Sequence, residues 1–309
     1  EKILKELDRE YPKIEFLLEL IDKRSFVEFR TLLGDVPAPD LALYFDEMPE
    51  NYRQRFFRLL PKDIASDVFV EMDTELQHYL INSFTDKELS IIVSDLYLDD
   101  TVDIIEEMPA NVVKRIIKAS SRENRTIINE LLRYPEDSAG TVMTTEYVRL
   151  RADMNVAEAL AHIKKVAIDK ETIYTCYVTD ADRHLLGLVT ARRLFLFQAD
   201  TLISDIMESN VIFAVTTEDK EEVALKFNKY GFIAMPVVDT EYRLVGIITV
   251  DDAIDVFREE VKEDIEKMAA IIPSDTDYLH TKPFSLFKAR IPWLLLLMVS
   301  ATFSSTILS

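Results

Sequence analysis

An internal duplication in the second half of the chain constrains the fold more than any other feature. Three pairs of identical residues recur at an offset of 59 positions: Asp180 and Asp239, Gly187 and Gly246, Thr190 and Thr249. The segments that contain them, DADRHLLGLVTARR (180–193) and DTEYRLVGIITVDD (239–252), align without a gap. Three matches at one offset indicate a duplication, so the sequence predicts two copies of one small domain.

The sequence pattern of each copy predicts the same order of elements: a helix, then two β-rich segments with a tight turn between them. The helical pattern covers 156–166 in the first copy and 220–230 in the second. The predicted strands are 174–179 and 185–190, then 234–238 and 244–250. The second half therefore predicts a tandem of α/β domains.

The first half predicts a run of short helices. An apolar residue followed by a helix-starting residue recurs from position 48 to 108, with successive spacings of 12, 12, 12, 13 and 11. These points are Met48-Pro49, Leu60-Pro61, Met72-Asp73, Phe84-Thr85, Tyr97-Leu98-Asp99 and Met108-Pro109. Pro, Asp and Thr start helices because the first helical residues either need no N–H partner or can be capped. Helices this short bury their apolar faces only by stacking on neighbours, so residues 14 to about 134 predict an α-solenoid of either hand.

The segment 249–268 predicts a strongly acidic amphipathic helix. Between Asp251 and Glu266 it has eight carboxylates and two cations. One face is apolar: Ile254, Phe257, Val261, Ile265 and Met268. The opposite face is acidic: Asp252, Asp255, Glu259, Glu263 and Glu266. Taken alone, this face fits either simple solvation or the binding of a polyvalent cation or a basic partner.

The last 19 residues, 291–309, contain no charged side chain. At about 1.5 Å per residue, such a helix just reaches across a hydrocarbon core of about 30 Å. Lys282, Lys288 and Arg290 precede it and Trp293 lies at its edge, as expected for a membrane helix that begins on the cytoplasmic side. A buried core helix is the alternative. We predict a first transmembrane helix, with residues 1 to about 290 cytoplasmic.

Composition excludes several functions. A net charge of −20 argues against nucleic acid as a partner. The single cysteine, Cys176, allows no internal disulfide, and its apolar neighbours predict a buried strand thiol. No nucleophile, base and oxyanion donor occur in a recognisable pattern, so we do not expect an enzyme.

The duplicated segment resembles the cystathionine beta-synthase (CBS) domain pair, through an h-x-G-h-h-[ST]-x-x-[DN] pattern in which h is apolar. This resemblance implies a site for an adenine nucleotide whose ribose is held by the last Asp of the pattern. Asp252 fits that position, but the first copy has Arg193 there, and Thr175 stands where a tyrosine would stack on adenine. ATP is therefore only a secondary candidate ligand.

The whole chain resembles the cytosolic part of MgtE-type magnesium channels. The resemblance is carried by EDSAGTVMTTEYV (136–148), ETIYTCYVTD (171–180), MPVVDTEYRLVGIITVDDAIDVFREEVKEDI (235–265) and RIPWLLLL (290–297). It implies a multidomain protein: an all-α solenoid, an α/β CBS pair, and a long connecting helix that leads into a transmembrane helix. The implied domains are 1–134 (solenoid), 135–200 and 201–255 (CBS copies), 252–272 (acidic connecting or plug helix), 273–290 (linker) and 291–309 (first transmembrane helix).

The resemblance also implies the function and its residues. Mg²⁺ would bridge the plug helix to the solenoid and CBS domains and so close the pore of a homodimer in a bacterial inner or plasma membrane, with subunits joined through the CBS domains and the transmembrane region. The implied metal ligands are Asp67, Asp99, Asp103, Glu221, Asp252, Asp255, Glu260 and Glu263. One departure is Gly231, where the family pattern can carry an aspartate. The alternatives are a nucleotide-sensing CBS module and a membrane-anchored adaptor that binds a protein.

Overall fold

The computed structural model describes residues 11–34, 36–268, 287–288 and 291–300. These residues fall into two compact units. Unit 1 contains the chain up to Glu136 together with Thr144–Val148 and His162–Ile173. Unit 2 contains Asp137–Met143, Arg149–Ala161 and the chain from Tyr174 onward.

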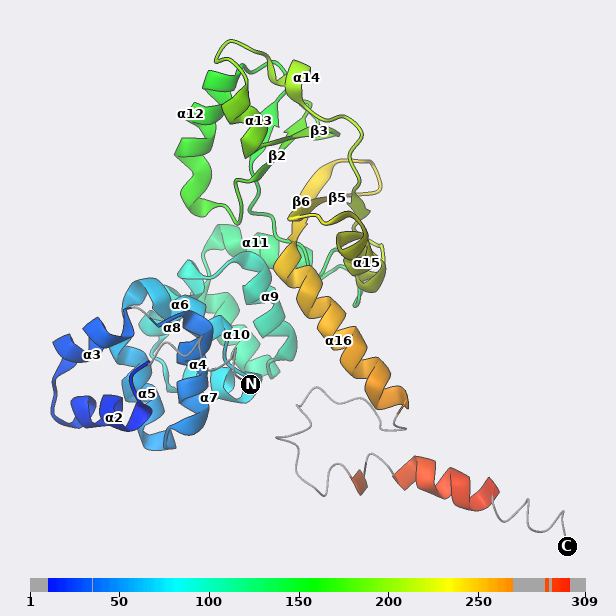
Figure 1. The fold of residues 1–309 in the computed structure, drawn as a ribbon. Coiled ribbons are helices and arrows are strands. Elements are labelled where there is room, and N and C mark those ends of the chain that lie inside the picture. The colour runs from blue at the N-terminus through cyan, green and yellow to red at the C-terminus, as the bar shows by residue number, and fades with distance from the viewer. Residues whose placement is uncertain (1–10, 35, 269–286, 289–290, 301–309) are drawn as a thin grey trace, which may run out of the picture. The chain divides into compact units, whose positions relative to one another are not determined.

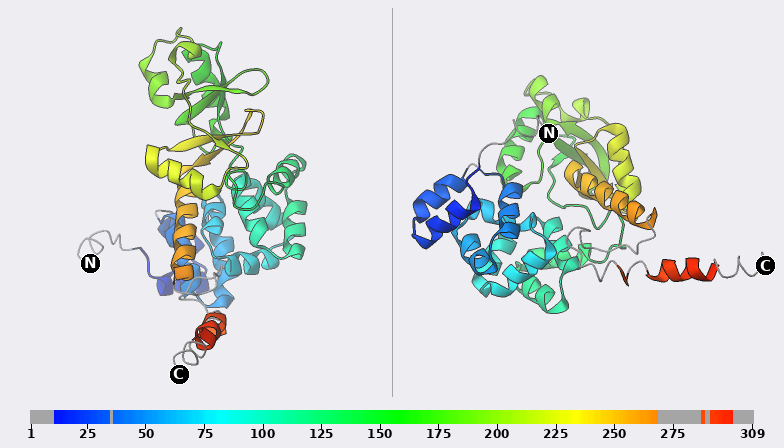
Figure 2. Two further views of the ribbon diagram at one scale, coloured as in Figure 1. Left: turned by 90° about the vertical axis from the view of Figure 1, so that its right-hand side faces the viewer. Right: turned by 60° about the horizontal axis from the view of Figure 1, so that its bottom comes forward.

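Unit 1 is built from short helices, which Figures 1 and 2 show in blue to cyan as a stack of rods. Its described helices before Glu136 are α2 (Ile14–Asp22), α3 (Phe26–Leu33), α4 (Ala38–Glu47), α5 (Glu50–Leu59), α6 (Lys62–Val70), α7 (Thr74–Ser83), α8 (Asp86–Asp95), α9 (Leu98–Glu107), α10 (Ala110–Ala119) and α11 (Arg122–Leu131). The predicted helical repeat is thus confirmed.

The repeat is more regular than the sequence pattern suggested. The residues that precede α4 to α11 are spaced by 12 throughout: Pro37, Pro49, Pro61, Asp73, Thr85, Tyr97, Pro109 and Ser121. The sequence pattern gave spacings of 13 and 11 here because it placed the helix start after Tyr97, whereas Tyr97 itself is the N-cap of α9. The polar caps satisfy exposed N–H groups, as Asp73 does by accepting from the Leu76 N–H at 2.7 Å.

The core of unit 1 forms between helices that are two apart in the chain. Helix α4 packs on α6, α6 on α8, α8 on α10, and α9 on α11. Phe45, Phe56, Phe57, Phe69 and Phe84 form an aromatic chain through this core, with ring centroids 5.2–6.2 Å apart. Aromatic pairs of this kind contribute about 0.5–1.5 kcal/mol each beyond their buried area.

The duplicated segment forms two matching three-stranded sheets. The first copy comprises β1 (Arg149–Arg151), α12 (Val156–Val166), the short 3-10 helix η1 (Ala167–Asp169), β2 (Thr175–Thr179), β3 (Leu185–Thr190) and α13 (Ala191–Leu196). The second comprises α14 (Ile203–Ile206), β4 (Ala214–Val215), α15 (Lys220–Tyr230), β5 (Ala234–Val238), β6 (Leu244–Thr249) and α16 (Val250–Met268). Each sheet pairs its first two strands in parallel and its last two in antiparallel fashion, with a bulge at Val178/Thr179 and at Val237/Val238. The predicted fold class, an all-α helical repeat followed by a tandem of α/β domains, is confirmed.

The beginning of each copy pairs with the other copy, which the sequence did not reveal. The Ala139 N–H donates to the Glu218 carbonyl at 2.7 Å, and the Ile203 N–H donates to the Met154 carbonyl at 2.8 Å. Glu208 exchanges two backbone hydrogen bonds with Leu188 of β3. A Cβ at Gly187 would lie 2.8 Å from the Glu208 carbonyl oxygen, so this close approach explains the glycine of the motif.

Two sequence predictions concern the end of the chain. The acidic segment forms one continuous helix, α16, up to Met268 (Figure 1), and 269–272 lie outside the described residues. Residues 291–300 are helical, and the remainder of the predicted membrane segment, 301–309, also lies outside them. Within the described part of the chain, no helix combines the length and apolar character needed to cross a membrane.

Candidate functional site: two groups of acidic residues

The eight predicted metal ligands fall into two groups. Asp67, Asp99 and Asp103 belong to unit 1, on α6 and α9. The other five belong to unit 2: Glu221 on α15, and Asp252, Asp255, Glu260 and Glu263 on α16.

In unit 2 the structure brings Glu221, Glu260 and Glu263 together, because the beginning of α15 packs against the middle of α16. Burial, followed by the charges of Glu221 and Glu263, raises the pKa of Glu260 above its ordinary value. Repulsion of this kind between carboxylates weakens when a cation binds beside them.

Lys220 already supplies one cation to this acidic group. Its ammonium lies 3.0 Å from Asp137 and 3.6 Å from Glu259. Burial opposes the charged form, but these carboxylates raise the pKa of Lys220 overall. Sequence reasoning missed Asp137 because it lies more than 80 positions before α15 and α16 (220 − 137 = 83). Its contact with Lys220 arises from the pairing between the two CBS copies.

Acids of α16 also have partners that are close to them in the chain. Asp255 pairs with Arg258 at 3.0 Å, and Glu263 pairs with Lys267 at 2.6 Å. Exposed pairs of this kind contribute about 0–1 kcal/mol, so a divalent cation could displace them. Asp252 accepts from the Thr249 N–H at 3.2 Å and from the Thr249 hydroxyl at 2.5 Å, which gives it a capping role at the beginning of α16.

In unit 1, Asp99 is the most unusual carboxylate. Its side chain is buried, and its Oδ1 atom has no hydrogen-bond partner among the described residues. Burial and the neighbouring charge of Asp100 raise the pKa of Asp99 to about 7, although a hydrogen bond with Thr144 favours the ionised form. Asp99 is therefore not a solvated acid, although its place in the first turn of α9 also complements the dipole of that helix. An orphaned buried carboxylate oxygen suits a hard cation.

Other acids extend the environment of Asp99. Tyr97, at the cap of α9, has its pKa raised by burial and then by the charges of Glu171, Glu146 and Asp67. Asp67 and Asp103 are themselves exposed on their helices. The sequence did not predict that Glu146 and Glu171 belong to the same unit as Asp99, because they come from segments that follow the helical repeat.

Two positions of the first copy lack the side chains expected for a ribose and adenine site. Thr175 is buried within β2, so its side chain offers no stacking surface. Arg193 is in α13, and its Nη1 atom is buried without a hydrogen-bond partner among the described residues. Gly231, the other departure, ends α15 with φ of 67°, a left-handed conformation that favours glycine over aspartate.

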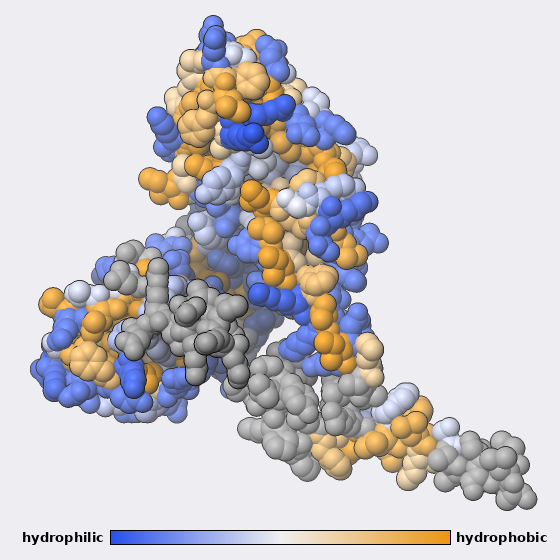
Figure 3. Space-filling model, viewed as in Figure 1, coloured by the Kyte–Doolittle hydropathy of each residue, from blue (hydrophilic) through white to orange (hydrophobic). Residues whose placement is uncertain are grey.

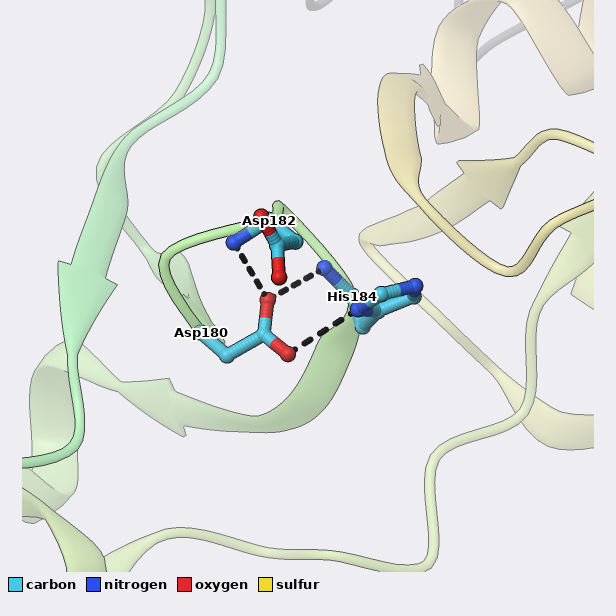
Figure 4. A group of neighbouring side chains, drawn as sticks. All are labelled: Asp180, Asp182 and His184. Atoms are coloured by element: carbon cyan, nitrogen blue, oxygen red, sulfur yellow. Dashed lines mark hydrogen bonds and ion pairs between the residues drawn. The ribbon is translucent and has the colours of Figure 1, made fainter.

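A further group, Asp180, Asp182 and His184, has the donor atoms for a metal (Figure 4). Asp180 accepts from the N–H groups of Asp182 and His184 at 2.9 and 2.8 Å, and its other oxygen is 2.9 Å from His184 Nδ1. In the second copy, Asp239 accepts from the N–H groups of Glu241 and Arg243 in the same way, at 2.8 and 2.9 Å. The duplicated carboxylate therefore shapes the β-hairpin turn.

Comparisons with known proteins agree with this architecture. The family model described as the MgtE intracellular N domain matches residues 36–137, and the CBS domain model matches residues 139–200 and 203–259. The magnesium transporter MgtE of Thermus thermophilus is 36% identical over 94% of this chain and 66% of its own length. That of Bacillus subtilis is 33% identical over 91% of this chain and 62% of its own length. The chain thus spans less than two thirds of these relatives.

Solved structures give the same result. A crystal structure of the cytosolic domain of the Mg²⁺ channel MgtE in complex with ATP has a TM-score of 0.75 and 35% identity, covering 79% of this chain and 100% of that one. The soluble part of a magnesium transporter has a TM-score of 0.74 and 31% identity, covering 80% and 97%.

A helical N domain followed by a CBS pair is the domain order of the MgtE structures to which this chain is similar. The chain belongs to the MgtE family of magnesium transporters.

Proposed function

We propose that this chain is the Mg²⁺-sensing cytosolic region of a magnesium channel or transporter, and that α16 is the plug helix that couples sensing to the pore. The observation that carries the proposal is that the charges of Glu221 on α15 and Glu263 on α16 raise the pKa of Glu260, where the two helices pack on each other. Their mutual repulsion is relieved when a cation binds, so cation binding and the arrangement of α16 are thermodynamically linked.

The physical chemistry of Mg²⁺ fits weak, distributed sites. Mg²⁺ keeps several waters and takes one or two carboxylates rather than a closed protein cage. Changing a population from mostly open to mostly closed requires roughly 5.5 kcal/mol of differential binding. Several weak sites can supply this free energy together, whereas a single weak site cannot. We therefore assign ligand roles to both acidic groups, including Asp67, Asp99 and Asp103 of unit 1.

We also propose that the chain acts as a homodimer at a bacterial inner or plasma membrane, with the segment 291–309 as its first transmembrane helix and residues 1 to about 290 cytoplasmic. Apolar side chains that remain exposed on unit 2 support the dimer. Phe195 and Leu196 of α13 are 77% and 70% exposed. The apolar face of α16 is also exposed, and hydrophobic atoms are visible along this helix in Figure 3. Surfaces of this kind indicate a protein or membrane contact.

Hydrogen exchange of α16 with increasing Mg²⁺ tests the sensing role. We expect millimolar Mg²⁺ to slow exchange in α16 and around Glu221, and we expect Glu260→Gln with Glu263→Gln to shift this response to higher Mg²⁺. The matched control is Glu123→Gln with Glu130→Gln, which removes two exposed carboxylates from α11. The proposal would be refuted if hydrogen exchange in α16 did not depend on Mg²⁺, or if its Mg²⁺ response shifted equally in both double variants.

Nucleotide sensing is the second candidate, because a related cytosolic domain has been crystallised with ATP. Arg193 and Thr175 argue against a ribose and adenine site in the first copy, whereas Asp252 retains the expected carboxylate. Calorimetry with ATP, ADP and AMP decides between these readings. Heat that disappears in Asp252→Ala would support nucleotide binding, and no heat with any nucleotide would reject it.

A further inference from the structure

Unit 1 contains a small cleft where α8 packs on α10. Its volume is about 330 Å³, which lies near the lower end of the range of small-molecule sites. The charged part of its lining consists of Lys114, Arg115, Lys118 and Asp86, Ser90 adds a hydroxyl, and Leu89 and Ala119 supply an apolar floor. Three cations therefore face one carboxylate.

The walls of this cleft are tied in place. Arg115 donates from Nη1 to the Ile81 carbonyl at 2.8 Å and from Nη2 to the Phe84 carbonyl at 2.9 Å. The Ser90 hydroxyl of α8 donates to the Ala119 carbonyl at the end of α10 at 3.0 Å. These bonds fix the guanidinium and the two helices before any ligand arrives, which lowers the entropic cost of binding.

The charges in the cleft are only loosely compensated. Asp86 lies 3.6 Å from Arg115 Nη2 and 3.5 Å from Lys118 Nζ, and its side chain is 75% exposed. Lys114 forms no ion pair with any described residue. The surrounding segment 114–125 has five cations and one carboxylate, in a chain whose net charge is −20. This segment is therefore positively charged, whereas the protein as a whole is negatively charged.

We propose that this cleft binds a small phosphorylated anion, in addition to the cations of the proposed function. A phosphate group presents several charged oxygens, which suit the remaining N–H groups of a fixed guanidinium and two neighbouring Lys ammonium groups. Asp86 sits where such an oxygen would bind, and it is the internal competitor that a ligand phosphate displaces. The apolar floor of Leu89 and Ala119 accommodates a small organic part of the ligand.

Calorimetry of the whole chain with inorganic pyrophosphate tests this site, in EDTA so that no Mg²⁺ is present. We expect Lys114→Ala with Lys118→Ala to weaken binding about tenfold or more, which is about 1.4 kcal/mol. Lys164→Ala with Lys165→Ala is the matched control, because it removes two exposed lysines from α12 and changes the net charge equally. We expect Asp86→Asn to strengthen binding.

The outcomes are distinct. The site is supported if pyrophosphate affinity falls in the Lys114→Ala with Lys118→Ala variant, is unchanged in the control and rises in Asp86→Asn. The same test with ADP distinguishes the ligand: an affinity that exceeds that of pyrophosphate and falls in the cleft variant indicates a nucleoside diphosphate, and an affinity equal to that of pyrophosphate indicates recognition of the phosphates alone. Absence of pyrophosphate binding, or equal weakening in both double variants, overturns the proposal. Because Mg²⁺ is excluded, these results are independent of the Mg²⁺-sensing test.

Discussion

Removing the Asp99 carboxylate should change the stability of unit 1 in a pH-dependent way. The folded protein holds the pKa of Asp99 at about 7, against an ordinary value of 3.8. Between these values the folded state keeps a proton that the unfolded state has lost, so the free energy of unfolding falls as pH rises. Below pH 3.8 both states are protonated, and above pH 7 both are ionised. The whole interval corresponds to about 4 kcal/mol.

The variant Asp99→Asn is neutral at every pH and therefore escapes this loss. In the absence of Mg²⁺, we expect α9 of the variant and of the unaltered protein to be equally protected near pH 4, and the variant to be better protected at pH 8, by up to about 4 kcal/mol. Saturating Mg²⁺ should restore protection at pH 8 only in the unaltered protein, because the cation stabilises the ionised carboxylate.

Hydrogen exchange of α9 measured by mass spectrometry is the appropriate assay, because it reports local opening without requiring two-state unfolding of both units. Comparing the two proteins at each pH cancels the intrinsic pH dependence of exchange. Asp103→Asn is the control, since Asp103 is exposed one turn away and should change stability by less than about 0.5 kcal/mol. A difference between Asp99→Asn and the unaltered protein that is the same at pH 5 and pH 8 would refute the reasoning.

Substitutions at three further positions test the fold. Gly187→Ala should destabilise unit 2 by about 1–3 kcal/mol, because its Cβ would meet the Glu208 carbonyl; an unchanged thermal midpoint would contradict this. Gly231→Ala should lower the free energy of unfolding by about 1 kcal/mol, because φ is positive there although no atom crowds the position. Gly231→Asn should lower it less; equal thermal midpoints for the two variants would contradict this. Thr85→Ala should cost about 1 kcal/mol by removing the capping box with Glu88, measured by hydrogen exchange of α8.

Local patterns predicted most of the secondary structure. The helices 156–166 and 220–230 and the strand 185–190 agree with α12, α15 and β3 at both ends, because hydrophobic period and turn residues act within a few positions of each other. The cap at Tyr97 was misplaced by one residue, since a tyrosine gives no capping signal. Strands β1 and β4 were not predicted, because two or three residues are too few to show a period.

The candidate sites divide in the same way. The sequence alone determined that α16 is acidic on one face and apolar on the other, and that a CBS pair follows a helical repeat, because these properties depend on the order of residues along the chain. Only the tertiary structure decided that Glu221 approaches Glu260, that Lys220 reaches Asp137, and that Asp99 is buried with an unpaired oxygen. Burial and long-range proximity result from packing between segments, which no local pattern records.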